Sequence, residues 1–340
     1  MMSGVVCSSR RVLAVAVAGV LGLVLAVVLP VPAEAATTLG AGAARTGRFF
    51  GAAVQARFLG EAPYATVLNR EFTSVTPEVE LRWSTVEPQR NLFNFYSADQ
   101  VAFHARSRGI RLRGHLVGPS WLPGWLTSLP NAANTRVAMI NHINVMMTRY
   151  RGVFGTWDVV SEAFADTPGA PRRPTVFQQW LGDGYIEEAF RAARAADPAA
   201  KLCYNDYGIE DVDKPKGRAV LTLVRDLKAR GVPIDCVGLE SRFDPRSAPL
   251  PASYLRTLEE FAALGVDVEI TQLDVAGGGT PQADTYRAVV VACLAVPRCT
   301  GITVWGIPDH YSSHPLDTPL LFDRNYAKKP AYDAVLIALG

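Results

Sequence analysis

The sequence alternates short apolar strand patterns with longer amphipathic helix patterns along most of its length. Eight segments rich in β-branched and aromatic residues predict strands, at 49–54, 72–75, 110–116, 156–160, 202–205, 236–239, 266–273 and 301–305. Seven segments with helical apolar spacing accompany them, at 97–108, 134–150, 185–196, 214–230, 251–264, 281–295 and 330–339. Eight strands alternating with helices over roughly 300 residues are typical of an α/β fold of the (β/α)₈ TIM-barrel type.

A doubly wound open sheet uses similar strand–helix units. It normally carries a glycine-rich phosphate loop after its first strand, and no G-x-G-x-x-G is found here. We see no internal repeat, linker or low-complexity block. The sequence therefore predicts one barrel domain over residues 36–340, and no organic cofactor.

Polar and aromatic residues gather where the predicted strands end. In a barrel these carboxyl ends share one pocket. The set consists of Glu78, Arg82, His115, Glu162, Asn205, Asp206, Glu240, Arg242, Gln272, Asp274, Trp305 and Asp309. Any single member has a structural explanation as an ion-pair partner, and Glu162 would equally cap a helix. Together they predict a mouth that binds a saccharide or another small molecule.

The first 35 residues have the composition of an export signal. Arg10 and Arg11 form a basic start, the segment 12–31 is almost wholly apolar, and Ala33-Glu34-Ala35 matches a small-x-small cleavage site. The paired arginines favour neither the Sec nor the Tat route. A permanent membrane anchor is the competing explanation, but no basic cluster follows the apolar run. We expect a secreted protein that has no membrane contact after cleavage.

The charge balance argues against nucleic acid as a partner. The chain carries a formal net charge of +2, and loss of the leader with Arg10, Arg11 and Glu34 lowers it by one. No basic stripe remains to follow a phosphate backbone. We expect a small molecule or saccharide as the partner, and a monomer.

Four cysteines remain after the leader, and an even number in an exported chain predicts disulfides. The short spacing favours Cys293 with Cys299, which leaves Cys203 with Cys236. Zinc is the alternative, but no Cys-x-x-Cys and no nearby histidine supports a metal site.

Many motifs along the mature chain resemble the secreted glycoside hydrolase family 10 xylanases of actinomycetes. They are Thr76-Pro77-Glu78, Phe93-Asn94-Phe95, Arg113-Gly114-His115, Trp157-Asp158-Val159-Val160, Glu162-Ala163-Phe164, Tyr204-Asn205-Asp206, Gly231-Val232-Pro233-Ile234-Asp235, Thr303-Val304-Trp305-Gly306 and Thr318-Pro319-Leu320-Leu321-Phe322. The resemblance implies a TIM barrel, the two disulfides above and a monomer.

The same resemblance implies two catalytic carboxylates. Retaining glycosidases of this kind place an acid/base opposite a nucleophile, about 5–5.5 Å away. The acid/base position matches Glu162. The nucleophile position matches Gln272, where the family has Glu, and an amide is too weak a nucleophile to form a glycosyl ester.

Other positions that grip the sugar in the family also differ. Val79 and Ser161 stand where the family has Asn, and Arg82 replaces its Lys. Glu240 and Arg242 replace a Gln and a His, whereas Pro308 and Ser313 replace an Arg and a Trp. The segment after His115 is shorter than in the family.

Three hypotheses follow, and the substitutions lead us to expect the first. The first is a repurposed enzyme that uses Glu162 as general acid/base on a non-xylan substrate, for cyclisation, isomerisation, elimination or hydration. The second is a non-catalytic binding protein whose Trp121, Trp125 and Trp305 stack on rings, unless they are core residues. The third is a glycoside hydrolase with a relocated nucleophile or base, for which Glu240 is the candidate.

Overall fold

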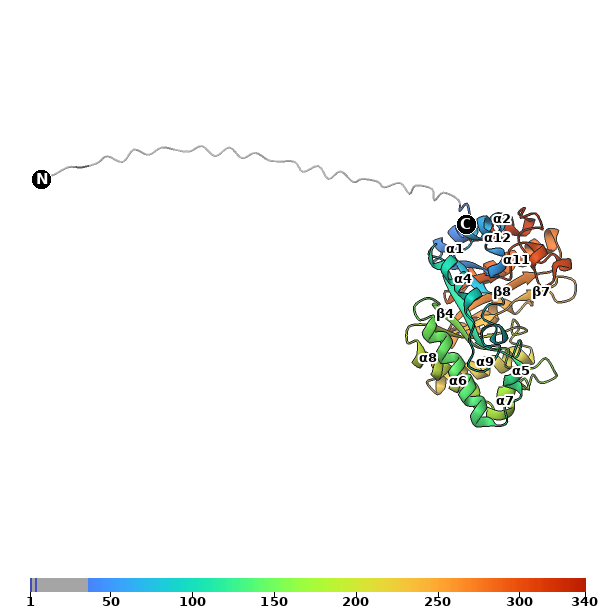
Figure 1. Cartoon of the computed structure of the whole chain (residues 1–340). Coiled ribbons are helices and arrows are strands. Elements are labelled where there is room, and N and C mark those ends of the chain that lie inside the picture. The colour runs from blue at the N-terminus through green and yellow to red at the C-terminus, as the bar shows by residue number, and fades with distance from the viewer. Residues whose placement is uncertain (2–3, 5–35) are drawn as a thin grey trace. The chain divides into compact units, whose positions relative to one another are not determined.

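The computed structural model describes Met1, Gly4 and residues 36–340. The proposed leader, apart from Met1 and Gly4, lies outside the described residues. Residues 36–340 form one compact unit, and Figure 1 shows its helices surrounding its strands.

The strands close into a parallel barrel. They are β1 (Phe49–Val54), β2 (Ser74–Pro77), β3 (Arg111–Val117), β4 (Thr156–Ser161), β5 (Lys201–Asp206), β6 (Cys236–Leu239), β8 (Asp267–Val275) and β9 (Cys299–Val304). Neighbours pair in sequence order, β9 pairs with β1, and β6 pairs with β8. All these pairings are parallel. The predicted (β/α)₈ TIM barrel is therefore confirmed.

The helices connect the strands around the outside of the barrel. The longer ones are α2 (Ala62–Glu71), α4 (Tyr96–Arg106), α6 (Ala132–Arg149), α8 (Gly184–Ala196), α9 (Pro215–Ala229), α10 (Tyr254–Ala263), α11 (Gly279–Ala295) and α12 (Pro330–Leu339). The shorter ones are α1 (Leu39–Arg45), α3 (Trp83–Val86), α5 (Gly124–Thr127) and α7 (Val176–Leu181), with 3₁₀ turns at Ala56–Phe58, Asp309–Tyr311 and Pro315–Asp317. None of the described helices is long and apolar enough to cross a membrane.

The short helices α3, α5 and α7 were not predicted from the sequence, and neither were one longer helix and one short strand. The helix α2 was not predicted, because its buried residues Tyr64, Val67 and Leu68 form only a narrow apolar stripe. Its end at Glu71 moves the next strand from the predicted start at residue 72 to Ser74. The two-residue strand β7 (Arg242–Phe243) was also missed, since two residues carry no periodicity.

Strand β4 is buried on both faces. Trp157 packs against Tyr150 and Phe154 on one face, whereas Asp158 lines the cavity on the other. Gly114 on β3 lies against the Trp157 ring, which a Cβ atom at residue 114 would overlap. Glycine at residue 114 therefore leaves room for the Trp157 indole, which comes from β4, to lie over the backbone of β3.

Both predicted disulfides are present. Cys203 and Cys236 join the paired strands β5 and β6, at positions that are direct register partners. Cys293 and Cys299 close the six-residue step from α11 to β9. Disulfides are typical of exported proteins, which agrees with the expected leader.

Candidate active site

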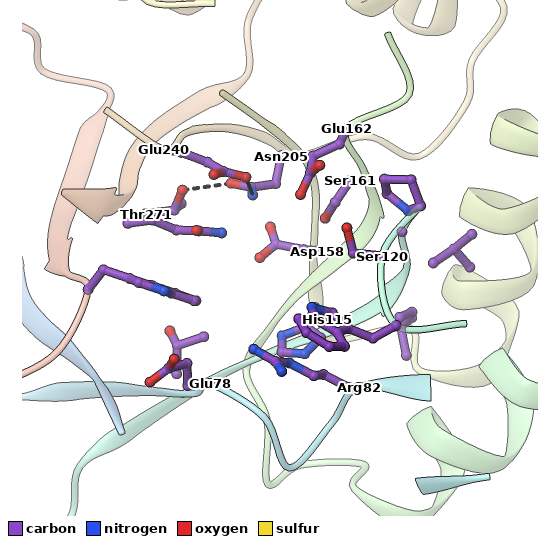
Figure 2. A pocket seen from close by; sticks show the side chains of 18 of the residues that line it. Glu78, Arg82, His115, Ser120, Asp158, Ser161, Glu162, Asn205, Glu240 and Thr271 are labelled. Atoms are coloured by element: carbon purple, nitrogen blue, oxygen red, sulfur yellow. Dashed lines mark hydrogen bonds between the residues drawn. The ribbon is translucent and has the colours of Figure 1, made fainter. Parts of the chain in front are cut away.

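The strand ends meet in one cavity of about 330 Å³ at the carboxyl-terminal mouth of the barrel. Figure 2 shows side chains from several strands pointing into this space. All nine predicted catalytic or ligand-binding residues line it, namely Glu78, Arg82, His115, Glu162, Asn205, Glu240, Arg242, Gln272 and Trp305. The residues that the sequence singled out therefore lie around one cavity.

Other predicted residues lie elsewhere. Asp206 binds Lys216 at 3.0 Å and Tyr204 at 2.6 Å, and Asp309 binds Lys329 at 3.0 Å. These carboxylates hold loops in place and do not line the cavity. Trp125, which the binding-protein hypothesis offered as a stacking platform or a core residue, does not line the cavity; its indole nitrogen donates to the Glu87 carbonyl at 3.0 Å and its ring packs beside Trp83.

Glu162 follows β4 in a strained backbone conformation. Its φ is +54°, a left-handed value that is uncommon for a residue other than glycine. Its amide donates to the Asn205 carbonyl at 2.8 Å, and its own carbonyl accepts from Arg173 Nε at 2.8 Å. Burial raises the pKa of the Glu162 carboxyl, while Arg173 and Lys216 act in the opposite direction. A carboxyl with a raised pKa is suited to donate a proton.

Glu240 follows β6 and is almost completely buried, with 3% of its surface exposed. Asn205 Nδ2 donates to one oxygen at 3.1 Å, and Arg242 Nε approaches the other at 3.4 Å. The Asn205 side chain is itself fixed by the Thr271 hydroxyl at 2.6 Å (Figure 2). Burial raises the pKa of Glu240 to about 8, and Arg242 opposes this shift.

The raised pKa of Glu240 predicts a pH-dependent loss of stability. The folded protein retains a proton that the unfolded chain releases near the ordinary Glu pKa of about 4.3. The stabilisation is therefore complete below that value and is lost as pH rises through about 8. We expect the free energy of unfolding of wild type to fall relative to that of Glu240→Gln over this window. Urea unfolding at several pH values measures it, and a constant difference would contradict the assignment.

Arg242 connects the ends of β6 and β8. It lies on β7, directly beside Asp274 in the register. Its Nη1 donates to Asp274 at 2.8 Å, and its Nη2 donates to Gln272 Oε1 at 2.6 Å. The ring of Trp305 lies 5.7 Å from the guanidinium carbon. Gln272 is thus held by a fixed cation at the edge of the cavity.

The opposite wall carries Glu78, Arg82 and His115 (Figure 2). Glu78 accepts from Gln55 at 2.7 Å. Arg82 stacks on Trp121, with 4.1 Å between the guanidinium carbon and the ring centroid. Burial, with help from the Arg82 charge, lowers the pKa of His115 to about 4, so this histidine is neutral at physiological pH.

Sequence reasoning missed the lining residues that lie inside the strands. Arg113 and Asp158 face the cavity from within β3 and β4, and they are paired, with Arg113 Nε donating to Asp158 at 2.9 Å. These two residues could have been found from the sequence, because each is a charged residue inside an otherwise apolar strand. Its partner on the neighbouring strand depends on the barrel register.

The side chains around Cys203 and Cys236 are of types that bind metal ions. Among the described residues, one group, Cys203, Cys236 and Glu269, has the spacing of a metal site. Both of its sulfur atoms are bonded to each other, so no thiolate is available to hold an ion.

Comparison with known proteins identifies the family. The model of glycosyl hydrolase family 10 matches residues 38–338. An endo-1,4-beta-xylanase of Agaricus bisporus is 39% identical over 311 residues, covering 86% of this chain and 92% of that protein. Endo-1,4-beta-xylanase B of Humicola insolens is 41% identical over 292 residues, covering 79% of each. The chain belongs to glycosyl hydrolase family 10.

Solved structures give the same result. Xylanase 10B of Thermotoga petrophila, in complex with xylobiose, aligns with a TM-score of 0.85 at 33% identity, covering 90% of this chain and 98% of that one. A glycosylated endo-beta-1,4-xylanase of Gloeophyllum trabeum aligns with a TM-score of 0.83 at 36% identity, covering 89% and 99%.

Proposed function

We propose that the protein is a glycoside hydrolase that cleaves a β-1,4-linked, xylan-like polysaccharide, with Glu162 as the acid and Glu240 as the second carboxylate. Family membership and relatives named endo-1,4-beta-xylanase support the reaction class. The observation that carries the residue assignment is that Glu162 and Glu240 line one cavity, in which the Glu162 charge contributes to the raised pKa of Glu240.

Hydrolysis requires two proton transfers, and the glycosidic bond to the anomeric carbon is replaced by a bond to the oxygen of water. Glu162 gives its proton to the leaving glycosidic oxygen as the bond to the anomeric carbon breaks. A water molecule attacks that carbon and passes a proton to Glu240. This sequence inverts the anomeric carbon. If Glu240 itself attacks the carbon, the configuration is retained after hydrolysis of the ester, so the product distinguishes the two routes.

The charge state of Glu240 sets the expected pH dependence. Only the ionised carboxylate can accept a proton, and its pKa is raised to about 8. Glu162 must remain protonated at the same time, and the two groups titrate as a coupled pair. The rate of hydrolysis is therefore expected to follow a bell-shaped pH profile, which falls at low pH as Glu240 takes up a proton and at high pH as Glu162 loses one.

Hydrolysis of xylan and of aryl xylosides tests the proposal. We expect reducing ends to be released by the wild type and the rate to fall about 10²–10⁴-fold in Glu240→Gln. NMR of the first product gives the anomeric configuration. An inert wild type, or a Glu240→Gln variant as active as the wild type, would rule out this mechanism.

A second function is supported by one observation. Gln272 occupies the position that the family resemblance assigns to the nucleophile, and an amide there fits the repurposed enzyme with a non-xylan substrate, or a binding protein. The comparisons favour hydrolysis, since the relatives are endo-xylanases. If the wild type is inert and Gln272→Glu releases sugar, the cavity still accepts xylose and the binding protein is favoured. If both are inert, a non-carbohydrate substrate is favoured.

The proposal includes export. The leader of residues 1–35 would be removed after Ala35, so that a secreted monomer begins at Ala36, two residues before the family match starts. The mass of the mature protein from a culture medium checks this boundary.

A further inference from the structure

Contact with Arg242 determines which way the Gln272 amide points. A guanidinium group has five N–H donors and no acceptor. The amide atom that contacts it must therefore be the oxygen, and Oε1 accepts from Arg242 Nη2 at 2.6 Å. The opposite orientation would place two donors against each other at this distance.

Arg242 is not free to release that oxygen. Its Nη1 is bound to Asp274 at 2.8 Å, and its Nε faces Glu240 at 3.4 Å. The three nitrogen atoms of one planar group thus have three different acceptors. Because a planar fork has little freedom once bound in this way, the Gln272 oxygen stays on Arg242.

With its oxygen bound to Arg242, the Gln272 side chain has its amide nitrogen free to face the cavity. Gln272 lines the cavity wall. No described residue accepts a hydrogen bond from Nε2, yet this nitrogen is not among the polar atoms that are sealed from solvent without a partner. This nitrogen is therefore in contact with solvent at the wall, where it can donate to water or to a ligand.

We propose that Gln272 is a specificity-determining hydrogen-bond donor, so that the cavity prefers sugar-like ligands that present an acceptor oxygen to Gln272 over ligands that present a positive charge to it. The preferred class is a neutral sugar lactone or lactam, whose carbonyl oxygen accepts from the amide. The disfavoured class is a protonated imino sugar, whose N–H groups would meet the donors of Gln272.

The neighbouring charge strengthens this preference. The Arg242 cation lies directly behind the Gln272 amide, and a second cation in the same place would be repelled in a partly desolvated site. A carboxylate at residue 272 would reverse the situation, since it would attract a cationic ligand and repel a carbonyl oxygen. The inference rests on the proposed function only in that a sugar enters the cavity.

The test compares the affinities of two ligands of xylose configuration, a lactam and an imino sugar, at a pH where the imino nitrogen is protonated. Calorimetry measures Kd for the wild type, Gln272→Glu and Gln272→Met. We expect the ratio of lactam to imino-sugar affinity to be at least about tenfold higher in the wild type than in Gln272→Glu, as one hydrogen bond to a polar or charged group predicts. Gln272→Met, which has a similar shape and no donor, should bind the lactam several-fold more weakly.

Gln179→Glu is the matched control, because it makes the same change at an exposed position on α7, outside the cavity. Its affinity ratio should equal that of the wild type. Equal ratios in wild type and Gln272→Glu, unchanged lactam binding in Gln272→Met, or no binding of either ligand by the wild type would each overturn the proposal.

A parallel hydrolysis assay separates this proposal from the proposed function. Lactam preference without sugar release supports the donor role of Gln272 and rejects hydrolysis. Sugar release without lactam preference supports hydrolysis and rejects the donor role.

Discussion

Replacing Glu162 with Gln should lower kcat on xylan about 10²–10⁴-fold, the usual contribution of a general acid. The carbonyl and amide of residue 162 are held by Arg173 and Asn205 through backbone atoms, so the substitution leaves those contacts in place. The variant should therefore fold normally and still bind its ligand. Steady-state kinetics with a reducing-sugar readout measure the loss.

The leaving group of the substrate separates an acid from a residue that merely binds. An aryl xyloside with a highly acidic phenol needs no proton to depart, so Glu162→Gln should lose much less activity on it than on xylan. Glu259→Gln, an exposed change on α10, serves as the matched control and should behave as the wild type. An equal loss on both substrates would contradict the acid role.

Replacing Arg113 with Met should reduce the free energy of unfolding by about 3–5 kcal/mol, the typical result of removing one partner from a buried ion pair. The Arg113 side chain is only 4% exposed and bridges Asp158 and Glu269 inside the barrel. Lys201 compensates in part, since it lies 3.1 Å from Glu269. Asp158 would be left as a buried charge without a cation. Urea unfolding under non-reducing conditions measures the change.

The pH dependence of this loss has a definite sign. Without Arg113, the folded-state pKa values of Asp158 and Glu269 rise, because burial then acts on them with less opposition. A raised pKa destabilises the folded state progressively as the pH increases. The deficit should therefore be smaller at acidic pH than at neutrality. Arg111→Met, an exposed change on the same strand, should show no deficit; a similar deficit there would point to a general effect on β3.

Hydrophobic patterning was sufficient to predict the barrel. Strands such as β6 and helices such as α12 lie at the predicted residues, because a buried parallel strand and an amphipathic helix each leave a periodic trace. The helix α2 and the strand β7 show no such periodicity in the sequence. The apolar stripe of α2 is narrow, and β7 has only two residues.

The sequence predicted which residues form the candidate site, but not which of their side chains contact each other. The rule that strand ends meet in a barrel brought Glu162, Glu240 and Gln272 together. The rule does not say which side chains contact each other. The contact of Arg242 with Gln272 depends on β7 pairing beside β8, and the pKa of Glu240 depends on how completely that carboxyl is buried.

The sequence by itself determined the family, the barrel, both disulfides and the residues at its mouth, because these depend on local patterns and on motifs that lie along the chain. Only the tertiary structure decided that the oxygen of Gln272 faces Arg242 and that Arg113 balances two buried carboxylates. Such pairings join residues on different strands, and their energies depend on distance and desolvation. Both quantities are fixed only when the barrel closes.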